Sequence, residues 1–224
     1  MQILKFSLMV VLFSAIFLSA YSQAKDLNKI ETSAQVLNEF GKMKENIPEK
    51  MFNVAEGLII VPKMLNAGFG VAGKRGKGIA VIKNANGSWS NPVFVTLTGG
   101  SLGLQAGVQS VDLVLIFKSR ETLENIGKGS FTLGGDASVT AGPIGRNSGA
   151  ATDYKLDAEV YSYSKSKGLF AGVSLGGSSL HIDKKANQSY YGKKEEAKTL
   201  FAMGNKGNSK EITSLKRTLN GLFL

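Results

Sequence analysis

The sequence predicts an α+β fold, in which a strongly curved, glycine-rich antiparallel sheet or barrel-like meander is flanked by N- and C-terminal helices. Apolar residues alternate strictly with small or polar ones over residues 102–109, which is typical of a half-buried strand. The dipeptide Asn86-Gly87 separates two apolar runs and predicts a hairpin, because glycine accepts a positive φ and asparagine tolerates it. Many of the 27 glycines lie inside such runs, which favours bulges and bends that curl a sheet.

Helices are expected at both ends of this sheet. Apolar residues recur at spacings of three and four over residues 26–43, and Pro48 favours the start of a second, short helix. The first helix carries both charge signs and no tryptophan, so we interpret its apolar stripe as a cover for the sheet; the alternative is a helix that lies on a membrane. A stripe over residues 208–222 predicts the last helix, with Asn208 and Glu211 as a capping box.

Further elements are expected between these ends. Residues 113–117 form a continuous apolar run, which is typical of a strand buried on both faces. Ser119 predicts the cap of a short helix that runs to about residue 126. The remaining expectations are strand character over 131–141, a glycine-rich loop over 142–152, a hairpin of 154–162 with 169–175, and a short helix over 193–201.

The first 24 residues predict a secretory leader. A short basic region precedes an apolar run over residues 6–18 and small residues follow it, a run too short for a comfortable membrane span. Cleavage is expected after Ser22 or after Ala24, and the alternative is an uncleaved anchor. We therefore expect an exported protein that is periplasmic, attached to the cell envelope or secreted, with residues 25–224 as a single domain.

Charge and composition limit the classes of function. The net charge of +10 favours anionic partners, namely nucleic acid or anionic lipid. The chain has no cysteine, which excludes disulfides, thiol catalysis and thiolate metal sites. We interpret its one histidine, His181, as structural, because a metal site or a catalytic triad needs further oriented groups. No catalytic residue, metal site or cofactor is therefore predicted, and the alternative is an envelope hydrolase with an unrecognised site.

One basic segment is a candidate binding site. Lys74, Arg75 and Lys77 lie between glycines, and we expect them at a hairpin tip or in a loop. The segment is not a nucleotide-binding loop, because Gly78 follows Lys77 where that loop needs Ser or Thr to hold magnesium. Cations and unobstructed backbone N–H groups can still bind lipid phosphates, and the alternative is a solvated hairpin tip.

Motifs rich in glycine and aromatic residues occur in a specific order along the chain. They are Pro62, Gly68-Phe69-Gly70, Gly73, Gly76-Lys77-Gly78, Gly87-Ser88-Trp89-Ser90-Asn91-Pro92, Gly103-Leu104-Gln105-Ala106-Gly107, Gly142-Pro143-Ile144-Gly145-Arg146, Tyr161-Ser162-Tyr163-Ser164, residues 168–174, Asn187 and Tyr190-Tyr191-Gly192. This order resembles the SYLF domain family of lipid-binding proteins over roughly residues 30–203. The resemblance implies binding of membrane lipids, with phosphoinositides and actin as partners in the eukaryotic adaptor members, and it names no reaction.

The resemblance also favours lipid binding by the basic segment, and Lys63, Lys83 and Arg146 are added to it as further candidates. Anionic phospholipid is therefore the expected partner. Nucleic acid is not expected, because the chain has an export signal and lacks the aromatic-studded strand of single-strand binders. Actin is not expected either, because an exported chain would not meet actin in its own cell. The lipid headgroup and the oligomeric state stay open at the level of sequence.

Overall fold

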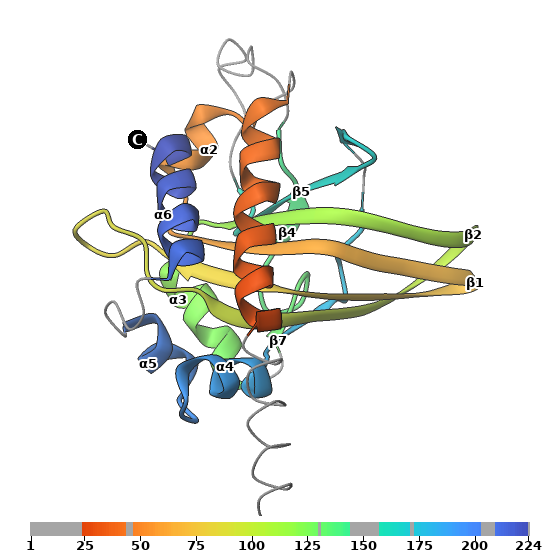
Figure 1. Ribbon diagram of the computed structural model, residues 1–224. Coiled ribbons are helices and arrows are strands. Elements are labelled where there is room, and N and C mark those ends of the chain that lie inside the picture. The colour runs from red at the N-terminus through yellow and green to blue at the C-terminus, as the bar shows by residue number, and fades with distance from the viewer. Residues whose placement is uncertain are drawn as a thin grey trace, which may run out of the picture.

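The computed structural model describes residues 24–43, 47–129, 131–143, 157–170, 173–202 and 209–223; at residues 49, 69–72, 101–106 and 223 it describes the backbone alone. A helix over residues 24–42 comes first. The elements that follow are α2 (Glu49–Asn53), β1 (Gly57–Ile82), β2 (Val93–Phe117), α3 (Arg120–Asn125), η1 (Ile126–Lys128), β3 (Phe131–Thr132), β4 (Val139–Ala141), β5 (Val160–Ser166), β6 (Leu169–Phe170), β7 (Ser179–Ile182), α4 (Lys184–Tyr191), α5 (Ala197–Ala202) and α6 (Lys210–Phe223). The predicted α+β class, with a curled sheet and helices at both ends, is confirmed (Figure 1).

The sheet is built around one long antiparallel hairpin of β1 and β2. These strands pair from Gly57 opposite Phe117 to Ala80 opposite Val93, and the turn between them contains Gly87 at φ 80°, as the hairpin prediction requires. The described residues form a seven-stranded sheet in the order β3-β7-β2-β5-β4, with β1 beside β2 and β6 beside β5. β7 pairs with the first half of β2, and β5 pairs with its second half. The shorter strands therefore extend the sheet from both halves of the long hairpin.

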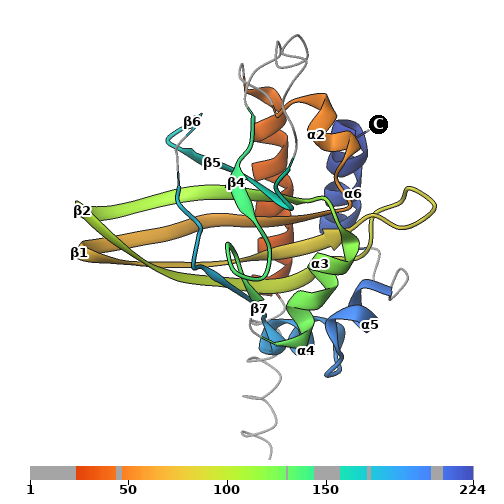
Figure 2. The ribbon, with the colours of Figure 1, turned by 180° about the vertical axis from the view of Figure 1, so that it is seen from behind.

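Glycines allow the hairpin to curl back on itself. The register shifts between Val61 and Met64 and again between Gly68 and Gly70. A Cβ atom at Gly78 would lie 2.0 Å from the carbonyl oxygen of Ile60, so the second half of β1 touches the first half along its backbone. The predicted bulges and close backbone approach are therefore present, and Figures 1 and 2 show the pair projecting as a long curled blade.

The sheet is covered on both faces, and the two faces have separate cores. We call inner the face of β1 that carries Val61, Met64 and Ala80, which pack in one apolar cluster with residues of α3, η1, β7 and α5. We call outer the face that carries Ile60 and Ile79, which pack in a second cluster with the helix over residues 24–42, α2 and α6.

The apolar stripe of the first helix lies in the second cluster. Ile30, Ala34, Leu37 and Phe40 are all buried there, so the interpretation of this helix as a cover for the sheet is confirmed. The last helix is confirmed as α6, whose Ser209 hydroxyl accepts a hydrogen bond from the Ile212 N–H at 3.3 Å. Its predicted cap residue, Asn208, lies outside the described residues.

Several boundaries differ from the predictions. The predicted hairpin tip at residues 74–78 is wrong, because these residues lie inside β1 and pair with residues 95–99 of β2. The strand predicted over 131–141 is two short strands, β3 and β4, separated by a tight turn. The second hairpin turns at Lys167-Gly168, within the predicted turn, and its first strand, β5, runs further than predicted. Among the described residues, its second strand is β6. The helix predicted over 193–201 is α5, and α4 was not predicted.

Ser119 caps α3 as predicted, with its hydroxyl accepting from the Thr122 N–H at 3.3 Å. Most of the loop predicted over residues 142–152 lies outside the described residues. Among the helices that the structure describes, none combines the length and the apolar character needed to cross a bilayer.

Candidate functional site

The basic segment lies within β1, and this placement separates its cations. Neighbouring residues of a strand point to opposite faces of the sheet. Lys74 therefore lies on the inner face with Gly76 and Gly78, whereas Arg75 and Lys77 lie on the outer face. The outer pair is exposed, and Lys74 is 5% exposed. The segment predicted as one basic loop thus presents its charges to two different environments.

Lys74 is held on the inner face by the backbone of a distant segment. Its Nζ donates a hydrogen bond to the carbonyl oxygen of Ser174, and its backbone lies opposite Gly99 of β2. Burial lowers the pKa of the Lys74 ammonium group below the ordinary value of 10.5.

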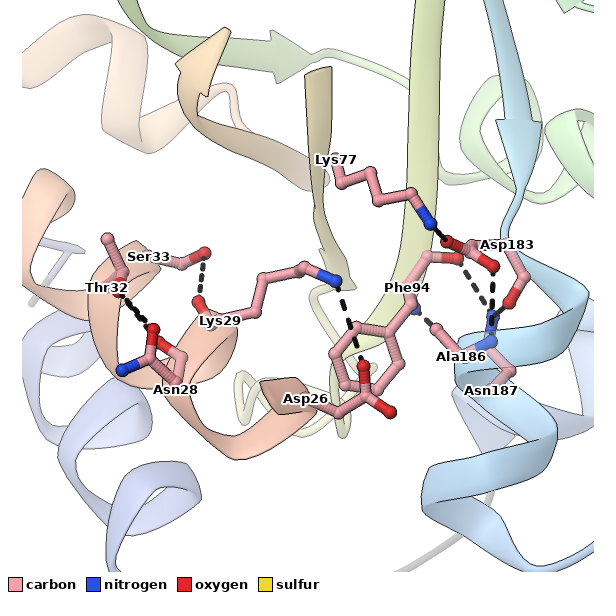
Figure 3. A network of polar contacts seen from close by, with 10 residues as sticks. All are labelled: Asp26, Asn28, Lys29, Thr32, Ser33, Lys77, Phe94, Asp183, Ala186 and Asn187. Carbon is pink, nitrogen blue, oxygen red and sulfur yellow. Dashed lines mark hydrogen bonds and ion pairs between the residues drawn. The ribbon is translucent and has the colours of Figure 1, made fainter. Parts of the chain in front are cut away.

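Lys77 takes part in a polar network on the outer face (Figure 3). Its Nζ lies 2.6 Å from Oδ2 of Asp183, whose other carboxylate oxygen caps α4 by accepting from the Ala186 N–H at 3.1 Å. Burial would raise the pKa of Asp183, but the hydrogen bonds from Lys77 and from Ala186 and the charges of Lys77 and Lys29 together hold it below its ordinary value.

The same network reaches the first helix. Nζ of Lys29 lies 3.8 Å from Oδ1 of Asp26 and 5.4 Å from the centroid of the Phe94 ring. Burial raises the pKa of Asp26, although the charge of Lys29 opposes it. These residues join the first helix, β1, β2 and α4, and so the network ties the first helix to the sheet (Figure 3). Asp183 was missed by the sequence prediction, although an Asp three residues before Ala186 is a typical helix cap.

The other candidate cations come from other parts of the sequence. Lys63 is exposed at the first register shift with φ 50°, and its backbone N–H donates to Oδ1 of Asp112 at 2.9 Å. Lys83 is half-buried and forms an isolated bridge with Trp89 at the closed end of the hairpin. Arg146 lies outside the described residues. The lipid-binding role of all these residues stays a prediction.

Several residues of the family motifs hold the fold together. The Asn187 side chain accepts from the Phe94 N–H and donates to the Phe94 carbonyl, both at 2.9 Å, so it pairs with β2 as a strand would. The Tyr191 hydroxyl donates to the Pro92 carbonyl at 2.6 Å. A Cβ at Gly142 would lie 2.1 Å from the ring of Tyr163, whose hydroxyl donates to the Pro143 carbonyl at 3.1 Å. These motifs indicate an architecture rather than a reaction centre.

The described residues contain no group of three or more His, Asp or Glu side chains placed to hold a metal ion. His181 lies in β7 opposite Thr96, which in turn lies opposite Lys77 across the sheet. This histidine is half-buried within a strand, and its structural interpretation stays a prediction.

Comparison with known proteins gives consistent matches. The family model Ysc84, described as Las17-binding protein actin regulator, matches residues 98–222. LAS seventeen-binding protein 3 of Saccharomyces cerevisiae is 36% identical over 187 residues, which are 82% of this chain and 40% of that protein. SH3 domain-containing YSC84-like protein 1 of Homo sapiens is 36% identical over 171 residues, 73% of this chain and 50% of that protein. The chain thus spans half or less of the length of these relatives.

These matches correct one prediction about partners. We did not expect actin, because an exported chain would not meet it in its own cell. That expectation is wrong: the matching family model is described as an actin regulator, and LAS seventeen-binding protein 3 is named for binding Las17. The names describe binding and regulation rather than catalysis. With a family model that covers residues 98–222 and relatives above 30% identity over most of its length, this chain belongs to the Ysc84 family, the family of the SYLF domain.

Proposed function

We propose that this chain is a noncatalytic adaptor that brings anionic membrane lipid together with actin filaments. The observation that carries the proposal is membership of a family whose model is described as an actin regulator. The lipid part is supported by the net charge of +10 and by β1, which carries four cations and no acidic residue. An exposed cation close to an anionic bilayer contributes about 1 kcal/mol to binding. Arg75 is such a cation, because it is exposed on the outer face and makes no ion pair with a described residue.

We also propose that residues 1–24 are a secretory leader, cleaved after Ser22 or Ala24, ahead of one domain over residues 25–224. An exported chain reaches actin-pathway proteins only in another cell. Whether residues 1–24 direct export therefore determines in which cell the adaptor binds its partners. The intact mass of protein recovered from its native source tests this. A mass that begins at Gln23 or Lys25 supports export, and a mass of the full-length chain contradicts it.

Two sedimentation experiments test the adaptor function. Purified protein is mixed with phosphatidylcholine vesicles that contain anionic phosphatidylserine, and separately with filaments of purified actin. We expect binding to the anionic vesicles that falls steeply with salt, because exposed charges are screened over about 8 Å at physiological ionic strength. Protein bound on vesicles should recruit actin filaments to the vesicle fraction. Absence of the protein from both pellets would contradict the proposal, and vesicle binding without actin would remove its actin part.

A further inference from the structure

Lys74 is unusual because it is a buried charge with no opposite charge beside it among the described residues. Burying an isolated ammonium group is costly, and buried lysines are normally paired. Lys74 is 5% exposed, and none of the ion pairs among the described residues includes it. Its one hydrogen bond goes to a neutral group, the carbonyl oxygen of Ser174.

Lys165 shows how this fold compensates the charge of another buried lysine. It is also 5% exposed, but its Nζ contacts the carboxylate of Glu39 and lies 3.7 Å from that of Asp112. The same ammonium lies 5.6 Å from the centroid of the Phe40 ring. Lys165 is thus compensated by two carboxylates and an aromatic face, whereas Lys74 has none of these among the described residues.

Two further buried polar groups on the inner face lack a hydrogen-bond partner among the described residues. Ser178 is completely buried, and its hydroxyl makes no hydrogen bond with any described residue. It lies against Gly99, the residue opposite Lys74, because a Cβ there would be 2.5 Å from the Ser178 Oγ. Oδ1 of Asn66 is also buried and makes no hydrogen bond with any described residue.

The inner face of the curled hairpin carries both Asn66 and Lys74. Gly78 lies against Ile60, and Gly76 lies against Val61 and Met64, so the second half of β1 runs antiparallel to the first. By the same progression, Lys74 is two residues beyond Gly76 and Asn66 is two residues beyond Met64, both on the inner face. The segment over residues 173–178 passes across this face between β6 and β7, as Figure 2 shows, and supplies Ser174 and Ser178.

We propose that Lys74, Ser178 and Asn66 form a binding site for a phosphate-type anion between the inner face and the segment over residues 173–178. The ammonium group has three N–H donors, and the hydroxyl of Ser178 is a further donor. The side-chain amide of Asn66 also donates when it is rotated, since its oxygen and nitrogen are not distinguished by shape. A phosphate group offers several acceptor oxygens and a negative charge, so it satisfies all three residues and compensates the buried ammonium.

The site rests on the proposed function in one respect: a membrane lipid headgroup is one source of the phosphate, and free orthophosphate is the other. Both sources share the same chemistry at Lys74. The alternative is that Lys74 only fastens the segment over residues 173–178 to the sheet, in which case no anion binds. The first experiment therefore tests whether an anion binds at Lys74. The second tests whether that anion is a lipid headgroup or free orthophosphate.

The first experiment compares thermal unfolding in orthophosphate and in chloride at equal ionic strength. We expect orthophosphate to raise the midpoint of the unmodified protein, because a ligand that binds only the folded state stabilises it. Lys74→Met, which keeps the length of the side chain and removes its charge, should weaken orthophosphate binding on the order of ten- to a hundredfold. The matched control is Arg75→Met, which removes the next charge along β1 from the opposite face and should keep the orthophosphate response.

A second variant keeps the test decisive if Lys74→Met does not fold. Ser178→Ala removes a hydroxyl that makes no hydrogen bond with a described residue, so circular dichroism should show an unchanged fold. Its orthophosphate affinity should fall about tenfold or more, the loss of one hydrogen bond to an anion. An orthophosphate response that is the same in the unmodified protein, Lys74→Met and Ser178→Ala would overturn the site.

The second experiment uses phosphatidylcholine vesicles that contain either phosphatidic acid, a phosphomonoester, or phosphatidylglycerol, a phosphodiester. If the lipid is the source, Lys74→Met loses binding to phosphatidic acid more than Arg75→Met does, and binding to phosphatidylglycerol changes less. If orthophosphate is the source, Lys74→Met loses the orthophosphate response and keeps its vesicle binding. No orthophosphate response in the unmodified protein, together with unchanged vesicle binding by Lys74→Met, overturns the site. The adaptor proposal survives that result if Arg75→Met weakens vesicle binding, so the two failures are distinguishable.

Discussion

Lys74 and Arg75 are neighbours in the chain, yet the structure gives them opposite environments. Lys74 lies on the inner face of β1 beside glycines and under the segment over residues 173–178, where it is buried. Arg75 lies on the outer face opposite Thr98 and is exposed. A run of cations in a strand therefore does not form one binding site, because the pleat divides it. The predictions below test how strongly the two faces differ.

The largest difference is expected from adding a single methyl group to each face. At Gly78, on the inner face, a Cβ would lie 2.0 Å from the carbonyl oxygen of Ile60 and 2.9 Å from the Cα of Val61. Backbone atoms cannot move aside cheaply, so Gly78→Ala should lower the free energy of unfolding by about 3 kcal/mol or more. Urea unfolding measures this change.

The matched control for Gly78→Ala is Gly73→Ala on the outer face. No atom lies within 4 Å of a Cβ at Gly73, so this substitution should change the free energy of unfolding by about 0.5 kcal/mol at most. Equal losses at the two positions would contradict the description of the inner face as the place where β1 meets itself.

The same glycines show what the sequence could predict and what it could not. Their number and position predicted bulges and close backbone contact, because a glycine in a strand needs such a reason. The cations between them suggested a loop, although glycines at positions 76 and 78 alternate with Arg75 and Lys77 as a strand requires. This alternation of glycines with cations already indicated a strand, but the high density of positive charge favoured the interpretation as a loop.

Long-range contacts in the site had no such signal. Asn187 pairs with Phe94, and Lys77 pairs with Asp183, across separations of 93 and 106 residues. Which side chains meet over such a distance depends on how the whole hairpin curls, and local patterns of polarity do not determine this curl. The buried hydroxyl of Ser178, which makes no hydrogen bond with a described residue, could not be predicted for the same reason, because its burial depends on how a distant segment crosses the sheet.

A second prediction concerns the cost of the buried charge on the inner face. In buffer without phosphate, Lys74→Met should raise the free energy of unfolding by about 1 kcal/mol at neutral pH, because it removes a desolvated ammonium group. Burial lowers the folded-state pKa of Lys74 below 10.5, so its charged form destabilises the folded state. This penalty is constant below the folded-state pKa and disappears as the pH rises from that value to 10.5.

The measurement for this second prediction is urea unfolding of both proteins from pH 7 upward. The advantage of Lys74→Met should shrink through the alkaline range and vanish near pH 10.5. The difference between the two proteins is used because burial also lowers the pKa of Lys29 and of Lys216. A loss of stability in Lys74→Met at every pH would show that Lys74 stabilises the fold by its hydrogen bond to Ser174.

An effect of similar size and opposite sign is expected from the paired cation of the outer face. Lys77→Met removes the ion pair with Asp183, which should cost about 1 kcal/mol near neutral pH because the aspartate is mostly buried and the lysine is half exposed. Asp183 has a lowered folded-state pKa, so its contribution is present above the ordinary value of 3.8 and is lost as the pH falls through the folded-state pKa.

Urea midpoints between pH 2 and pH 7 test this contribution. The unmodified protein and Lys77→Met should converge at acid pH, where the carboxylate is protonated in both. In a background of Asp183→Asn, Lys77→Met should have little further effect, as a double-mutant cycle requires for a direct pair. A constant difference across the whole pH range would exclude the ion pair as its cause.

The smallest effect on stability is expected at Arg75. Its side chain is exposed on the outer face and makes no ion pair with a described residue, so Arg75→Met should change the free energy of unfolding by no more than about 0.5 kcal/mol. Binding to vesicles of phosphatidylcholine and phosphatidylserine should nevertheless weaken by about 1 kcal/mol, or roughly fivefold, because one cation near an anionic surface is lost.

Co-sedimentation with these vesicles at two salt concentrations, beside urea unfolding, measures both quantities on the same variant. The difference in binding between Arg75→Met and the unmodified protein should shrink at high salt, since the interaction of an exposed charge is screened. Lys42→Met, which removes an exposed cation from the first helix, controls for the change in net charge alone. If both variants lose the same affinity, the outer face of β1 has no special position on the membrane and only the overall charge of the protein matters.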